Sequence, residues 1–251
     1  MEQRKNLIGA GQHKEYADGE EGLHFPRMEC PPLEHPDVEP FEIHPKYADK
    51  DFVILADVVK FIPGITADMV DWWWANLEKG YFLWAPGEHY GFEWIIPPCD
   101  GGYMTVEASY EFDPANPMAV TRRSIADEYP FAQCYEHVIM STFETHPGEM
   151  ILIHTWQDQD DGILWRDLSL MEGRWYKEVG NVFAHLPDFP SHMDYESRRL
   201  NQFLPQLYDM WKDHPDPWQN MHFDLRVRQR EDGTWERISP NLPPSVDDVQ
   251  N

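Results

Sequence analysis

The sequence contains little cysteine, few basic side chains and no long apolar run, and each absence narrows what the protein can be. Its three cysteines, Cys30, Cys99 and Cys134, are widely spaced and form no C-x-x-C pair, so neither a disulfide framework nor a thiolate zinc site is indicated. The chain has no run of about 18 apolar residues and no apolar segment after the charges near its start, which argues against a membrane span or a secretion signal. We therefore expect a cytoplasmic protein without a membrane partner.

Acidic residues outnumber basic ones by 45 to 20, which gives a formal net charge of −25. A charge of this sign repels the phosphate groups of nucleic acids, so nucleic acid is not expected as a partner. The 251 residues are 41% hydrophobic and 14% aromatic, which is enough for one large core.

The two ends of the chain differ from its middle. Residues 1–50 begin with a polar stretch and continue into CPPLEHPDVEPFEIHP, which is too proline-rich for a helix or a central strand. We expect this arm to be partly disordered or wrapped on the domain that residues 51–238 form. Residues 239–251 are rich in proline and aspartate and are expected to be a disordered tail.

The domain is predicted to combine an antiparallel sheet with two helices. DFVILADVVKF reads as a strand, and Thr66 then suits the N-cap of a helix that contains three consecutive tryptophans, which we expect to pack on neighbouring structure. A series of strand-like runs follows. The segments that separate these runs are P-G, PPCDGG, DPANP, THPGE and QDQDDG, which suit hairpins and short loops. The runs are YFLW, YGFEWII, YMTVEASYEF, AVTRRSIADEY, AQCYEHVIMSTFE, MILIHTW and ILWRDLSL. A long helix and a final hairpin follow, which is an α+β order.

The long helix, predicted at 191–211, carries the most informative pair of residues. Ser191 suits its N-cap, and Asp194 stands where a capping-box acid belongs. His192 and Glu196 fall on its inward-facing apolar stripe, where a carboxylate is costly unless it is paired or binds a metal. A His and a Glu one turn apart can bind one cation together, so a metal site is one interpretation. Taken alone, the pattern more often marks a solvated helix end, and residues earlier in the chain are needed to favour the metal.

Three blocks of the chain resemble the 2,4-diacetylphloroglucinol hydrolase (phloretin hydrolase-like) family. They are VVKFIPGITADMVDWWWANL, GYFLWAPGEH and the H-x-x-x-E helix that runs into RLNQFLPQLY, and they span roughly residues 52 to 211 in the family's order. The resemblance implies a helix-grip fold like that of Bet v 1 and START proteins, with a curved antiparallel sheet around a cavity closed by a long C-terminal helix. It also implies a zinc-dependent hydrolase that cleaves the carbon–carbon bond between an acyl group and a phenolic ring.

Carried over by residue, the resemblance implies a zinc site of two histidines and two glutamates. Its ligands are His89, Glu128, His192 and Glu196. The spacing to Glu128 departs from the family pattern, so Glu107 and Glu111 stay open as alternatives for the strand-borne ligand. Two imidazoles with carboxylates suit Zn²⁺ and, less distinctively, manganese, iron or nickel.

The resemblance further implies a catalytic role for three residues. Tyr81 matches a tyrosine that binds the phenol, and His137 matches the candidate proton donor to the ring. His154 is the alternative donor, or else stands in place of a second phenol-binding tyrosine. An asparagine expected three residues after the first metal histidine is replaced by Phe92.

Two other classes of protein stay open. One is a non-catalytic helix-grip protein that binds a ligand, and the other is a non-haem metal oxygenase acting on a similar aromatic substrate. In every case the expected partner is a small phenolic molecule, and a homodimer is compatible with the sequence.

Overall fold

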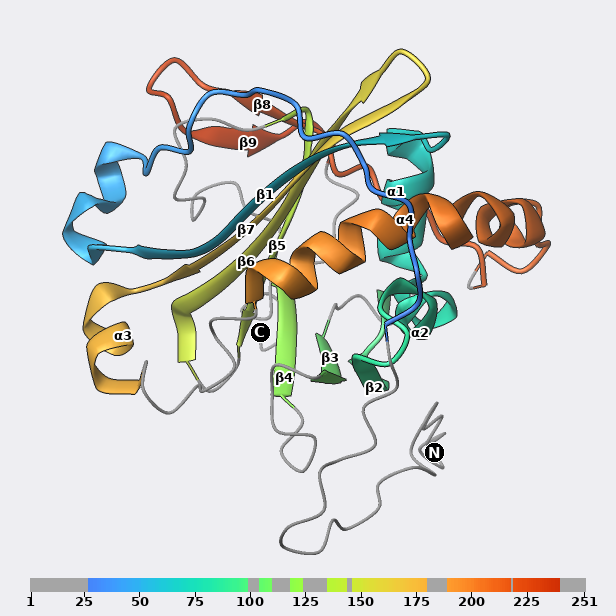
Figure 1. Ribbon diagram of the computed structural model, residues 1–251, viewed down its shortest axis with the longest axis horizontal. Helices are drawn as coiled ribbons and strands as arrows, with labels where there is room; N and C mark the ends of the chain where they lie inside the picture. Colours follow the sequence, from blue (N-terminus) through green and yellow to red (C-terminus); the bar gives the residue numbers. More distant parts are fainter. Residues whose placement is uncertain are drawn as a thin grey trace, which may run out of the picture.

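The computed structural model describes residues 27–98, 104–109, 118–123, 135–143, 146–179, 189–217 and 219–239. They form an α+β structure in which an antiparallel sheet packs against a long helix (Figure 1). The sheet has seven strands in the order β1-β7-β6-β5-β4-β3-β2. These strands are β1 (Val53–Pro63), β2 (His89–Ile96), β3 (Met104–Ser109), β4 (Met118–Arg123), β5 (His137–Phe143), β6 (His146–Gln159) and β7 (Gly162–Met171).

The antiparallel sheet predicted from the turn residues is confirmed, and the β6–β7 hairpin shows why the turn chemistry matters. Asp161 adopts a left-handed backbone with φ 64°, a conformation that aspartate tolerates better than most residues. Gly162 follows, where an added Cβ would collide with the carbonyl oxygen of Ile62 on the neighbouring strand β1. This turn lets β7 return between β1 and β6.

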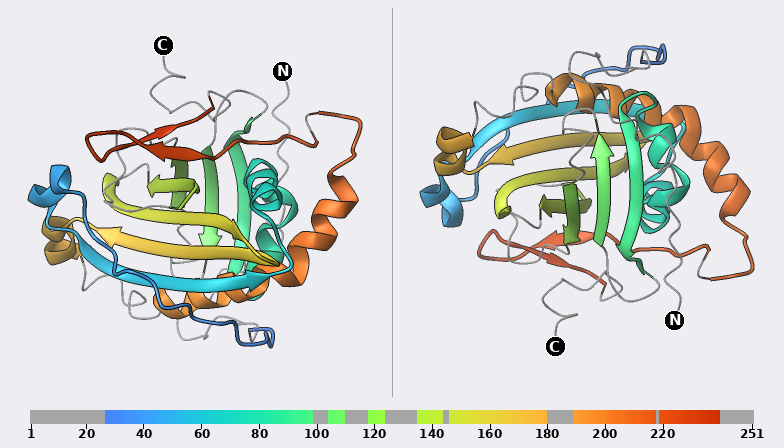
Figure 2. Two further views of the ribbon diagram at one scale, coloured as in Figure 1. Left: turned by 90° about the horizontal axis from the view of Figure 1, so that it is seen from above. Right: turned by 90° about the horizontal axis from the view of Figure 1, so that it is seen from below.

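Four helices accompany the sheet in the part of the chain that the structure describes. They are α1 (Ala67–Ala75), α2 (Tyr81–Trp84), α3 (Gly173–Val179) and α4 (Phe189–Trp211), with 3-10 turns at Pro45–Lys50 and Leu77–Lys79. Helix α4 packs against β1, α1 and α2, as the two views in Figure 2 also show. A proline, Pro205, lies inside α4 and removes one backbone donor from its second half.

Helix α1 confirms two predictions. Thr66 is its N-cap, with Oγ1 accepting from the backbone N–H of Met69 at 3.3 Å. Trp72, Trp73 and Trp74 are all fully buried. Their rings contact aromatic residues of α2 and α4, among them Trp84, Phe203 and Tyr208.

Two local predictions are wrong. YFLW forms the single helical turn α2, with the N–H groups of Leu83 and Trp84 both bonded to the carbonyl of Gly80; a four-residue apolar run does not distinguish a strand from a helical turn. The long helix begins at Phe189, so Ser191 is not its N-cap. The Ser191 hydroxyl instead accepts from Arg27 at 2.6 Å.

Both faces of the sheet are covered. The side chains of β1 alternate between the two faces of the sheet. Every second residue from Ala56 to Ile62 faces the helix and is buried. On the other face lie the later part of the arm, with Phe41 and Ile43, and the hairpin β8 (Val227–Gln229) and β9 (Trp235–Arg237). Every residue of β7 is buried as a result.

A cavity of about 390 Å³ lies on the arm side of the sheet. It is lined by Val38, Glu39, Phe41, Tyr135, Thr155, Leu164, Arg166 and Leu168. Among the helices that the structure describes, none combines the length and the apolar character needed to cross a membrane.

Candidate metal centre

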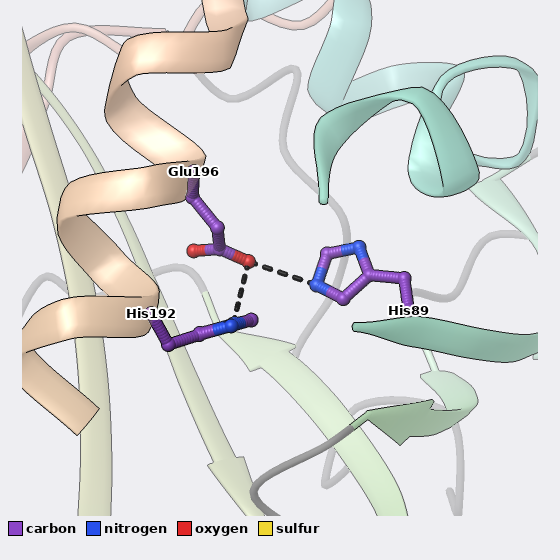
Figure 3. A group of neighbouring side chains, drawn as sticks. All are labelled: His89, His192 and Glu196. Carbon is purple, nitrogen blue, oxygen red and sulfur yellow. Dashed lines mark ion pairs between the residues drawn. The ribbon is translucent and has the colours of Figure 1, made fainter. Parts of the chain in front are cut away.

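Three buried side chains, two from α4 and one from the start of β2, point towards one another. His192 and Glu196 lie one turn apart on α4, and His89 begins β2 (Figure 3). The Oε1 atom of Glu196 lies 2.9 Å from Nε2 of His89 and 3.0 Å from Nε2 of His192. All three residues are at most 6% exposed, and their ligand atoms lie within 4.8 Å of one another. This cluster could hold a metal ion.

The other nitrogen of each imidazole is already bonded. Nδ1 of His89 is 2.7 Å from the carbonyl oxygen of Tyr81, and Nδ1 of His192 is 2.6 Å from Oε2 of Glu88. Since a carbonyl and a carboxylate can only accept, both Nδ1 atoms must donate. In the neutral imidazoles, Nε2 is then the atom with the lone pair, which is the form that binds metals.

This arrangement brings three electron-pair donors together in a buried place. The two Nε2 atoms and the Glu196 carboxylate repel one another unless the histidines take up extra protons or a cation lies between them. One divalent ion can replace those protons, because zinc binds imidazole nitrogen and carboxylate oxygen at about 2.0–2.2 Å. The donor set therefore fits a metal.

The charges in the cluster also favour a metal, because they lower the pKa of Glu196. Burial by itself raises the pKa of Glu196, but ion pairs and hydrogen bonds with His192 and His89 outweigh it and hold that pKa well below its ordinary value. The carboxyl group of Glu196 is thus kept ionised, as a metal ligand must be.

Glu88 links the cluster to the arm. Its carboxylate pairs with Nε of Arg27 as well as with His192. Burial tends to raise the pKa of Glu88, and the hydrogen bonds from His192 and Arg27 lower it overall.

A third buried histidine, His154, lies beside the cluster. Nδ1 of His154 on β6 is 2.6 Å from Oδ1 of Asp167, whose other oxygen lies 2.9 Å from Oγ of Ser197 on α4. The indole of Trp84 contacts His154 and also His89 of the cluster. Its ring centroid lies 5.7 Å from that of His154 and 5.3 Å from that of His89. Complete burial raises the pKa of Asp167, against the attraction of His154.

His137 forms a similar pair farther away. Its Nδ1 is 2.9 Å and 3.0 Å from the two carboxylate oxygens of Asp71 on α1, and its ring stacks on Trp156 at 5.8 Å. Trp156 in turn stacks on Trp74, which contacts His154. Burial raises the pKa of Asp71, although His137 pulls it down.

Tyr81 lies directly against a candidate ligand. Its ring stacks on His89 with centroids 4.1 Å apart and 9° between the planes. Phe92, which stands where the resemblance leads one to expect asparagine, packs on Tyr81 at 5.0 Å. This position therefore contributes an apolar wall to the site.

The fourth, strand-borne ligand stays a prediction. Glu128 and Glu111 lie outside the described residues. Glu107 lies on β3 opposite Phe92, where its carboxylate accepts from Thr105 at 2.7 Å. It is not part of the cluster found among the described residues.

Sequence reasoning did not identify the carboxylates that hold the histidines. These are Glu88, Asp167 and Asp71. The usable signal is an acidic residue within an otherwise apolar run, as in ILWRDLSL and MVDWWW, or next to a candidate ligand, as in GEH. Comparison with models of known families and with curated proteins found no match.

Proposed function

We propose that the protein is a zinc-dependent hydrolase that cleaves the carbon–carbon bond between an acyl group and a phenolic ring. The observation that carries the proposal is the convergence of His89, His192 and Glu196 on one buried point, beside a carboxylate-held histidine in an aromatic interior. The antiparallel sheet with a long helix packed along it is compatible with the helix-grip fold that the resemblance implies, which we also propose.

His89, His192 and Glu196 would hold the zinc ion. When bound, zinc supplies a Lewis acid for a carbonyl oxygen and lowers the pKa of water towards about 7. The rest of the site is built by aromatic rings, including Tyr81, Trp84 and Trp74, which suit a flat phenolic substrate.

The reaction also needs a proton donor. Hydrolysis adds the hydroxyl of water to the acyl carbon and a proton to the ring carbon, because a ring carbanion is a poor leaving group. His154 is the stronger candidate in the structure, since one indole, Trp84, touches both it and His89. His137 is the first choice of the resemblance, and the rings of Trp156 and Trp74 lie between it and His154.

In this arrangement Asp167 has a defined task. By accepting from Nδ1 of His154, it fixes the ring with Nε2 turned away from the carboxylate, which is the orientation that a proton donor to the substrate needs.

Metal analysis combined with an activity screen tests the proposal. Purified protein should contain about one zinc per chain, and under nitrogen it should convert an acylphloroglucinol to the deacylated phenol and a carboxylic acid. Protein that binds the phenol but holds no metal and forms no product would instead be a ligand-binding protein. The parent protein treated with a chelator provides the matched control.

An oxygenase is the second candidate, because two histidines and one carboxylate are also the ligand set of non-haem iron. Iron in place of zinc, with oxygen consumed in proportion to substrate, would identify that activity. Product formation at full rate under nitrogen would exclude it.

Tyr81→Phe should weaken substrate binding without loss of metal. We expect its hydroxyl to hold a ring phenol, so KM should rise severalfold and kcat should fall. The hydrogen bond from His89 uses the backbone carbonyl of Tyr81, so the substitution leaves that support in place. Steady-state kinetics with zinc content measured on the same samples will check this; unchanged KM and kcat would remove Tyr81 from the substrate site.

A further inference from the structure

We propose that Glu88 and Arg27 are positioning residues of the metal centre, and that Arg27 makes the N-terminal arm part of it. This inference rests on the proposed metal site and assigns a function to the contact between the arm and the domain. It starts from a difference between the two imidazoles: the carbonyl that holds His89 is neutral, whereas the group that holds His192 is a carboxylate.

A carboxylate behind a metal-binding histidine fixes the ring and makes it a stronger ligand. Glu88 does this for His192 across the gap between the loop that precedes β2 and the start of α4, at 2.6 Å. This loop ends at Glu88, and His89, the next residue, begins β2. Glu88 therefore sets the distance between the two elements from which the three candidate ligands come.

Arg27 holds these two elements together from outside. Its Nε pairs with Glu88 and its Nη1 donates to Ser191 on α4 at 2.6 Å. Its guanidinium also lies 5.2 Å from the ring centroid of Tyr195, one turn farther along the helix. A single side chain of the arm thus spans the loop and the helix.

The next contact of the arm repeats the pattern. The hydroxyl of Tyr195 accepts from the backbone N–H of Met28 at 2.9 Å and donates to the carbonyl oxygen of Pro86 at 3.1 Å. Arm, loop and helix are therefore joined twice, on the outer side of the candidate ligands. Glu88 is buried and contacts His192, whereas Arg27 is only half-buried and contacts Glu88. We therefore infer that Glu88 aligns the ligand His192 and that Arg27 aligns Glu88.

The test is zinc affinity measured by competition with a chelator. Glu88→Gln keeps the size of the side chain but loses its charge, and we expect zinc to bind about 10- to 100-fold more weakly, the usual range for such a supporting group. Arg27→Gln should weaken binding by a smaller factor, and Glu88→Asp should restore part of the loss. Arg198→Gln, which removes an ion pair with Asp194 on the same helix, is the matched control and should change nothing.

The unfolding midpoint of the metal-free protein distinguishes positioning from general stability. A variant that lowers this midpoint yet binds zinc as tightly as the parent would overturn the proposal, because Glu88 would then only support the fold. If the parent itself binds no zinc, the metal centre fails and this inference fails with it. If the parent binds zinc and both Glu88→Gln and Arg27→Gln match it, this inference alone is wrong.

Discussion

Replacing either His192 or Glu196 with alanine is expected to abolish tight metal binding and the stability that the metal provides. Each substitution leaves two of the three candidate donors in the buried cluster, too few for a closed metal site. A ligand that binds only the native state stabilises it by about 4 kcal/mol when present at about 1,000 times its dissociation constant. We expect that contribution to disappear.

The measurement is the unfolding midpoint with zinc and after chelation, together with metal content. The parent should unfold at a lower temperature once the metal is removed, whereas the two variants should show the same midpoint in both conditions. Gln206→Ala, exposed on the same helix, should behave as the parent does. Full metal occupancy in His192→Ala and Glu196→Ala would show that the helix pair is not part of a metal site.

His154→Ala is expected to reduce turnover by about 100-fold or more while zinc stays bound, the usual scale for a positioned general acid. The reason is that the indole of Trp84 contacts both His154 and His89, and that the carboxylate of Asp167 accepts from Nδ1 of His154. His137→Ala provides the comparison, because that ring also donates to a buried carboxylate but lies behind Trp156. Its effect should be distinctly smaller.

Steady-state kinetics on an acylphloroglucinol, with zinc measured on the same samples, will separate the two histidines. A large loss in His137→Ala with near-normal turnover in His154→Ala would return the proton donor to His137. Near-normal turnover in both would assign the proton to a group that neither substitution removes.

Much of the fold and part of the site can be predicted from the sequence. Helical spacing is enough to place His192 and Glu196 on the buried face of α4, because residues four apart share a face whatever the partner is. It does not locate the start of that helix, which lies at Phe189, because Ser191 has the chemistry of an N-cap although its hydroxyl is used by Arg27. Local chemistry therefore predicts faces better than boundaries.

Contacts between distant segments account for what the sequence does not reveal. His89 becomes a candidate only through the resemblance, because nothing near it in the chain indicates that α4 lies opposite. Glu88 is missed for the same reason: its partner His192 is 104 residues away, and the pair depends on how the loop before β2 meets the helix. Asp167 lies directly across the β6–β7 hairpin from His154, so that pair depends on the register of the hairpin. Strand periodicity gives the face of a side chain but not its neighbour.

The path of the arm along β1 has a consequence for association between molecules. β1 is the first strand in the order of the sheet, and an edge strand is a template on which another chain can add a strand. The backbone N–H of Phe61 on β1 bonds to the carbonyl oxygen of Glu34 at 3.1 Å, so the arm already occupies part of that template. We expect proteolytic loss of the arm to uncover this edge and to remove the contacts of Arg27 with Glu88 and Ser191, so that aggregation and loss of metal from the proposed centre begin with the same cut.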